Sequence, residues 1–255
     1  TLILTLFPYT TLFRSKLMPH VQTLVDTLTH YKTLPHHQDA KLAHVLQDIQ
    51  TWQKQRIRKS HNQLFTNPQT AALADYLVHR IYSDDAFDVV ANQLLTAGQK
   101  AQDGSGRLKK LIPQNVLATG VLGVKAAVMA VELDLVLAKV ILNNPTLYQM
   151  YQDTCIDWNL ITKAYPLAHQ KQERIAQTQN IQYVCKQSYH YFNSFLVQKA
   201  FDFAKNTAYE HGYQPLYDFI HDGLNAIKRI KKISDFTDSY TKIELMTIDK
   251  IYQTN

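Results

Sequence analysis

The chain has 255 residues, of which 45% are hydrophobic and 19% are charged, so it can bury a core and is not a disordered segment. Its formal net charge of +6 is compatible with an anionic partner but does not identify one. Only 7 residues are Gly and 8 are Pro. So few turn-forming residues argue against sandwiches, barrels and glycine-rich nucleotide loops, and they favour long helices.

Residues 1–15 do not read as native protein. Residues 5–15, TLFPYTTLFRS, are similar to the in-frame translation of a sequencing adapter. A signal peptide is the alternative, but Pro8 and the threonines interrupt the apolar stretch that such a peptide needs. We therefore expect native sequence from residue 16, with Met18 as a candidate start, and leave open whether an upstream segment was lost.

From residue 16 onwards, nearly every segment has the 3.6-residue period of an amphipathic helix, and Pro, Asn-Pro and Gly separate the segments. We expect Thr70 to cap the third helix. The predicted helices span residues 20–31, 39–65, 70–81, 86–101, 114–142, 146–164, 167–208, 215–232 and 235–252. The sequence thus predicts an all-α domain of about eight or nine helices over residues 16–255, with an exposed loop near residues 102–107.

The segment 114–142 is apolar nearly all round, so we predict that it is the central and most buried helix. Lys125, Glu132 and Lys139 are seven residues apart and share one stripe of this helix, where Glu132 is expected to pair with one of the lysines. These charges also interrupt the apolar run. A membrane span needs about 20 apolar residues, so we expect none here.

Four segments resemble, in order, those of the bacterial FFLEELY-motif proteins. They are residues 52–57 (WQKQRI), 76–87 (YLVHRIYSDDAF), 130–134 (AVELD) and 219–224 (FIHDGL). That family is helical and uncharacterised, so the resemblance, which covers residues 50–247, implies a fold and no chemistry. His79 and Arg80 stand where the name motif has two acidic residues. The motif positions, to which we assign a structural role, are Trp52, Gln53, Arg56, Tyr76, Tyr82, Phe87, Glu132, Asp134 and Gly223.

Three aromatic residues of these segments give a structural prediction. We expect Trp52, Tyr82 and Phe87 to be largely buried and to join the second, third and fourth helices.

A carboxylate-bridged metal site is the obvious enzymatic interpretation of an all-α core, but it typically needs four Glu and two Glu-x-x-His motifs. The chain has four Glu in total and none is followed by His three residues later. Asp218 and His221 are a weak substitute, and we favour a helix-surface pair there. Cys155 and Cys185 have no activating neighbour in sequence and are expected to be inert thiols, which suit a reducing cytoplasm.

Two basic clusters, at residues 54–59 and 228–232, raise the question of nucleic acid. The net charge, +5 without Arg14, is far below that of a dedicated nucleic-acid binder, so we do not expect such a partner. The 15 tyrosines, many of them after residue 180, suit either core and rim packing or a protein interface.

No motif has catalytic spacing, and no catalytic residue can be assigned. We therefore expect a cytoplasmic, non-enzymatic protein without cofactor that binds another protein or a second copy of itself. The alternative left open is an all-α bundle, with or without enzymatic activity, that binds a metal or an apolar small molecule through Asp218, His221, Glu132 or Glu173.

Overall fold

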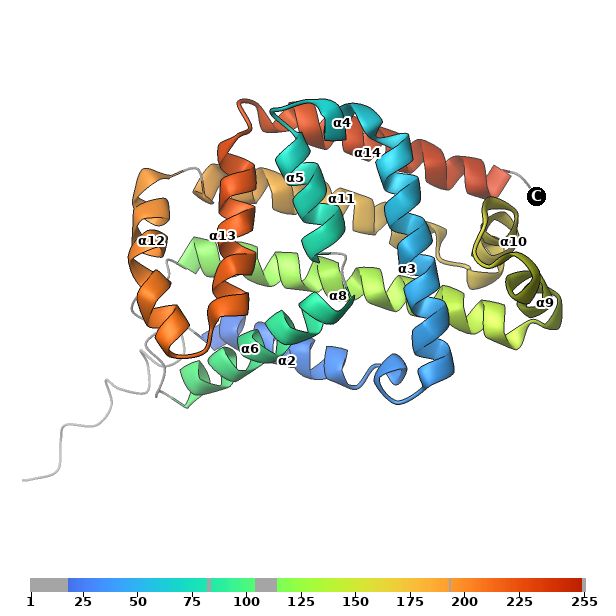
Figure 1. Cartoon of the computed structure of the whole chain (residues 1–255), viewed down its shortest axis with the longest axis horizontal. Coiled ribbons are helices and arrows are strands. Elements are labelled where there is room, and N and C mark those ends of the chain that lie inside the picture. Colours follow the sequence, from blue (N-terminus) through green and yellow to red (C-terminus); the bar gives the residue numbers. More distant parts are fainter. Residues whose placement is uncertain (1–17, 82–83, 104–113, 193, 254–255) are drawn as a thin grey trace, which may run out of the picture.

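Helix α8 (Gln114–Asn143) runs through the middle of the computed structural model, which describes residues 18–81, 84–103, 114–192 and 194–253 (Figure 1). Within these ranges the chain forms 12 α-helices and two short turns of other helical types, and no strand. The all-α fold class predicted from the sequence is confirmed.

The other elements follow one another with short connections. They are α2 (Met18–Lys32), η1 (Pro35–His37), α3 (Ala40–Ser60), α4 (Asn62–Thr66), α5 (Ala71–Tyr76), η2 (Leu77–Ile81), α6 (Asp84–Gln102), α9 (Pro145–Thr154), α10 (Trp158–Ala168), α11 (Lys171–Phe192), α12 (Phe195–Glu210), α13 (Gln214–Lys228) and α14 (Ile233–Gln253).

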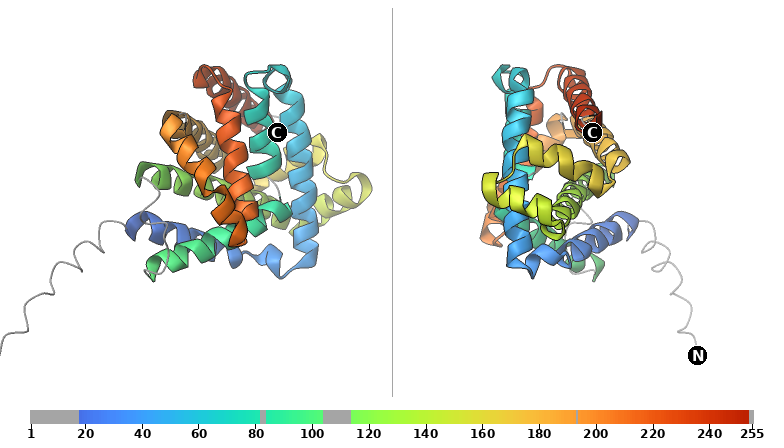
Figure 2. Two further views of the ribbon diagram at one scale, coloured as in Figure 1. Left: turned by 60° about the vertical axis from the view of Figure 1, so that its left-hand side comes forward. Right: turned by 90° about the vertical axis from the view of Figure 1, so that its right-hand side faces the viewer.

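The helices form two crossed layers. Figures 1 and 2 show α3, α5 and α13 running side by side across α8, α11 and α14. Helices α2 and α6 pack together below α8, while α9 and α10 close one end of the molecule. Helix α12 lies at the opposite end, where it packs mainly on α13. This arrangement leaves α12 at the edge of the fold.

Helix α8 is the centre of the larger hydrophobic core. Leu137, Ala138 and Ile141 have no exposed surface, and α8 packs against α2, α3, α10 and α11. A helix with apolar side chains on nearly all sides needs such neighbours to remove them from water. The predicted central helix is therefore confirmed, and Lys125 and Lys139 lie on its exposed stripe.

A second core fills the space between the two layers. It is built around Phe236 of α14, which is 1% exposed, with Leu73 of α5, Cys185 of α11 and Ile227 of α13. Burial raises the pKa of the Cys185 thiol to about 12, so this cysteine is a packing residue. The thiol of Cys155 is exposed.

The number of helices exceeds the predicted eight or nine because three predicted helices are interrupted. The helix expected over residues 39–65 ends at Ser60, and that expected over 167–208 is divided into α11 and α12. Between α9 and α10, Cys155 has a φ of 58°, and the carboxylate of Asp157 accepts a hydrogen bond from Leu160 N at 2.7 Å. A side-chain cap of this kind begins a new helix.

Three smaller expectations also have outcomes. Thr70 precedes α5, but its hydroxyl donates to the Leu64 carbonyl at 2.8 Å instead of accepting a helix N–H. The proposed adapter segment, Tyr82 and most of the expected loop at 102–107 lie outside the described residues. Of the helices that the structure describes, none is long and apolar enough to cross a membrane.

Candidate functional site

The segment that resembles the family's name motif spans the end of α5 and the π-helical turn η2. A π-turn shifts the following side chains relative to a regular α-helix, and such turns are frequent at functional sites. Here Val78 enters the core, His79 is exposed and Arg80 is half-buried. His79 therefore faces outwards from η2, whereas Arg80 lies partly inside the fold.

A groove of about 380 Å³ runs between α5–η2 and α13. The ion pair between Arg80 Nη2 and Asp222 Oδ2, at 2.7 Å, crosses it. At the α5 wall, Arg58 Nη1 reaches Asp75 Oδ1 at 3.2 Å. The groove is lined by Ala72, Asp75, Tyr76, His79, Arg80, Asp222, Asn225, Ala226 and Arg229.

Gly223 allows the two walls of this groove to meet. A Cβ atom at this position would lie 2.8 Å from the Cζ and Oη atoms of Tyr76, closer than real side chains approach. The Tyr76 ring also packs on Phe219, with 5.6 Å between ring centroids. Burial raises the pKa of the Tyr76 hydroxyl. Gly223 and Tyr76, both taken from the motif resemblance, are thus in contact across the groove floor.

We expect Gly223→Ala to lower the free energy of unfolding by about 1–3 kcal/mol, because the new methyl group forces the Tyr76 ring out of its packing. Gly120→Ala is the matched control, since nothing lies within 4 Å of the added atom inside α8. That change should raise stability by about 0.5–1 kcal/mol through helix propensity. Urea unfolding measures both, and equal effects of the two changes would contradict the contact.

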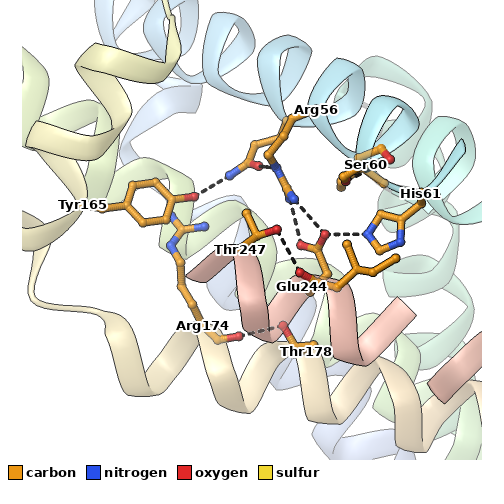
Figure 3. A network of polar contacts seen from close by, with 11 residues as sticks. Arg56, Ser60, His61, Tyr165, Arg174, Thr178, Glu244 and Thr247 are labelled. Atoms are coloured by element: carbon orange, nitrogen blue, oxygen red, sulfur yellow. Dashed lines mark hydrogen bonds and ion pairs between the residues drawn. The ribbon is translucent and has the colours of Figure 1, made fainter. Parts of the chain in front are cut away.

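A buried network of polar side chains lies where α3 and α14 meet (Figure 3). The guanidinium of Arg56 donates two parallel hydrogen bonds to Glu244, at 2.7 and 2.8 Å. His61 Nε2 lies 2.7 Å from the same carboxylate, and its ring stacks on Tyr240 with 4.7 Å between centroids. The ion pair of Arg56 and Glu244, which are 188 residues apart in sequence, therefore joins α3 to α14.

The network continues from α3 towards α8, α10 and α11. Gln53 Oε1 accepts from Arg56 Nε at 2.9 Å, while Gln53 Nε2 donates to the Tyr165 hydroxyl at 2.6 Å. The Arg174 guanidinium lies 4.4 Å from the Tyr165 ring centroid and pairs with Asp134 at 3.0 Å. Arg174 and Asp134 are both buried, so this second ion pair is shielded from water.

The electrostatics of the network favour fixed charges. Burial alone would raise the pKa of Glu244, but Arg56 and the hydrogen bond from His61 outweigh it and lower that pKa to about 2. Burial raises the pKa of Asp134 in spite of its pairing with Arg174. Glu244 is thus held as an anion, whereas burial of Asp134 opposes the charged form that Arg174 stabilises.

Residues 32–255 match the family described as a domain of unknown function (DUF8198). The chain belongs to this family. No curated protein and no solved structure matches it.

In this DUF8198 chain the motif positions on α3 have different roles. Gln53 and Arg56 belong to the buried network, as described above. Trp52 is only partly buried, and its ring lies 6.1 Å from that of Trp158 on α10. Trp52 thus packs against the larger core, and its ring faces Trp158 of α10, a neighbour that the prediction did not name. Phe87 is buried as predicted, at 4% exposure.

The carboxylate of Glu132 pairs with neither of the lysines proposed from sequence. It lies 2.6 Å from His30 Nε2 of α2, because α2 packs along this side of α8. Asp134, two residues later, turns inwards to Arg174. The two acidic motif positions of α8 therefore connect it to different neighbouring helices.

The weak metal candidates on α13 are engaged elsewhere. Asp218 accepts from the Tyr209 hydroxyl at 2.6 Å, and the His221 ring stacks on Tyr217. Glu173 is exposed on α11. Nowhere in the described part of the chain do three His, Cys, Asp or Glu side chains gather as metal ligands would.

Most of the late tyrosines pack within the molecule. Tyr217 is buried, and the hydroxyls of Tyr189 and Tyr209 donate to Lys231 O and Asp218. Among the described residues, the most exposed aromatic side chains are instead two phenylalanines of α12, Phe195 at 68% and Phe203 at 82%. The candidate protein-binding surface is therefore the outer face of α12, which we define by Phe195, Lys199, Asp202 and Phe203.

Sequence reasoning missed four members of the buried network: His61, Tyr165, Arg174 and Glu244. One signal pointed to Glu244: it is one of four Glu in the chain, and it lies one turn before Ile248 and two turns before Ile251 on the same helical face. The positions one turn before Arg174 are Gln170 and Lys171, so no local pattern marked Arg174 as buried. Neither residue's partner across the fold can be identified from its own helix.

Proposed function

We propose that this protein is a non-enzymatic helical module that acts by associating with another protein through the outer face of α12. The observation that carries the proposal is the exposure of Phe195 and Phe203 on one helix at the edge of the fold. Aromatic side chains are enriched at the centres of protein interfaces, where a partner removes them from water. Two phenylalanines left in water on one face are typical of such a surface.

The partner that we propose is a second copy of this chain. Phe195, Lys199 and Phe203 are four residues apart, so they share one face of α12. In an antiparallel pair with its two-fold axis at Lys199, Phe195 lies opposite Phe203 of the partner subunit. The two Lys199 side chains lie opposite each other at the axis, and each is within one turn of Asp202 of the partner subunit, whose carboxylate offsets the like charge. The face is therefore self-complementary in its aromatic side chains.

The contact is small for a stable dimer. Helix α12 has 16 residues, a length of about 24 Å at about 1.5 Å per residue. A standard interface buries about 1,600 Å² in total, more than one such helix pair supplies by itself. We therefore expect a dissociation constant in the micromolar range rather than an obligate dimer.

Light scattering during size-exclusion chromatography tests the pairing. We expect a mass near twice 29.4 kDa at roughly 100 µM, and the monomer mass for Phe203→Ser at the same concentration. Met246→Ser, which changes an exposed side chain of α14, is the matched control and should leave the dimer intact. A monomeric wild-type chain, or a dimer that Phe203→Ser does not weaken, would overturn the proposal.

A charge reversal tests the register. Lys199→Asp leaves four carboxylates and no cation from this face around the two-fold axis and should weaken the dimer at least tenfold. Adding Asp202→Lys to the same chain restores the opposite-charge pairing and should recover it. Failure of the second change to recover association would exclude this antiparallel register.

Two further parts of the proposal rest on sequence and composition. The free thiols of Cys155 and Cys185 suit a reducing compartment, and we propose the cytoplasm. The four segments that resemble FFLEELY-motif proteins support a relationship to that bacterial family. Its name motif would then be the segment that forms the wall of the groove described above.

A further inference from the structure

The groove between α5–η2 and α13 contains one positive charge that the chain does not balance. Arg80 pairs with Asp222 across it, and Arg58 pairs with Asp75 at its edge. Arg229 lines the same groove from the exposed end of α13. Throughout the described ranges, no acidic side chain lies within 4.0 Å of Arg229. An anionic group is the ligand chemistry that this end of the groove lacks.

The lining of the groove also includes apolar groups. Ala226 lies one turn before Arg229 on α13, and Ala72 lines the same groove from α5. The Tyr76 ring forms the floor between them, held there by its close contact with Gly223. A ligand that reaches Arg229 therefore also covers a small hydrophobic surface.

The η2 side of the groove also has a hydrogen-bond donor that lacks an acceptor. Arg80 binds Asp222 through Nη2 alone, while its Nε–H is buried with no acceptor among the described residues. A buried donor without an acceptor is unfavourable. The volume of about 380 Å³ falls in the range of small-molecule sites, about 300–1,000 Å³.

We propose that this groove binds a small organic acid, with a single carboxylate against Arg229 and an apolar body over Ala72, Ala226 and the Tyr76 ring. The planar guanidinium holds a carboxylate through two parallel hydrogen bonds. One carboxylate matches the one unbalanced charge, whereas a second anionic group would meet Asp75 or Asp222. The apolar body distinguishes this ligand from a simple inorganic anion.

Titration calorimetry on the full chain with benzoate as the probe tests the ligand class. We expect saturable benzoate binding, and binding at least tenfold weaker for benzamide, which has the same shape without the charge. Inorganic phosphate, which has charge without the apolar body, should also bind at least tenfold more weakly. No saturable benzoate binding, or equal binding of benzamide or phosphate, would overturn the proposal.

Variants then locate the site. Arg229→Gln should weaken benzoate binding at least tenfold, and the neighbouring exposed Lys228→Gln, which does not line the groove, should change it less than twofold. Asn225→Phe fills the groove from its exposed rim and should abolish binding without touching the core. Binding that survives both groove variants would place the acid elsewhere. The same titration on Phe203→Ser separates this proposal from the dimer, because the groove should bind equally well in the monomer.

Discussion

Replacing Glu244 with Ala should lower the free energy of unfolding by about 3–5 kcal/mol. The carboxylate accepts both Arg56 hydrogen bonds and lies against His61, inside the contact of α3 with α14. Without it, the Arg56 guanidinium stays charged and largely buried, because arginine does not lose its proton. The loss therefore includes the penalty of an unpaired buried cation and not only that of the missing hydrogen bonds.

Urea unfolding followed by circular dichroism measures this change. Glu244→Gln, which keeps the size and removes the charge, should lose less stability than Glu244→Ala. Glu173→Ala is the matched control, because this glutamate is exposed and should change stability by no more than about 0.5 kcal/mol. A loss below about 1 kcal/mol for Glu244→Ala would show that water reaches Arg56.

The same carboxylate predicts how stability depends on pH. The pKa of Glu244 is lowered from its ordinary value of 4.5 to about 2 in the folded chain. A lowered pKa means that the unfolded chain takes up the proton first, so stability falls as pH decreases. The contribution should be complete above about pH 4.5 and lost progressively towards pH 2. Glu244→Gln should flatten this part of the stability–pH curve, and an unchanged slope would contradict the assigned pKa.

The helices could be predicted from the sequence because their periodicity is local. The central helix is an example: it was predicted over residues 114–142 and is observed over Gln114–Asn143. Its apolar residues identify it as a buried helix without any knowledge of which helices pack against it. The breaks at His61 and between α9 and α10 were harder. The Asp157 cap is a local signal, but it lies inside a continuous apolar period that favours one long helix.

The candidate site depended on contacts far apart in sequence. Gly223 was identified only by resemblance. The physical reason for a glycine there is the close approach of the Tyr76 ring, which requires the contact between α5 and α13. Glu132 shows the opposite case. Its stripe on α8 suggested a lysine partner, but α2 packs there and supplies His30 at 2.6 Å instead. The helical period of apolar residues identifies the buried face of each helix, but it does not identify which other helix packs against that face.

The buried pair of Asp134 and Arg174 should respond asymmetrically to mutation. Asp134→Leu leaves the Arg174 cation, 7% exposed, in the interior between α8 and α11, and should cost about 3–5 kcal/mol. Arg174→Met leaves a carboxyl whose pKa burial already raises, so that carboxyl can take up a proton and become neutral. The Arg174 guanidinium cannot become neutral in the same way, because arginine does not lose its proton. We therefore expect Asp134→Leu to be the more damaging change, and the loss caused by Arg174→Met to shrink as pH falls.

The double variant Asp134→Leu with Arg174→Met completes the cycle. Both charges are then absent, and the new side chains can pack against the Tyr165 ring that Arg174 now covers. Replacing a whole buried ion pair by apolar residues is often neutral, so the double variant should be more stable than either single variant. Denaturant unfolding of the four chains measures the coupling. Additive losses would mean that the two charges do not interact, and that Arg174 stabilises the fold mainly through Tyr165 and the Leu133 carbonyl.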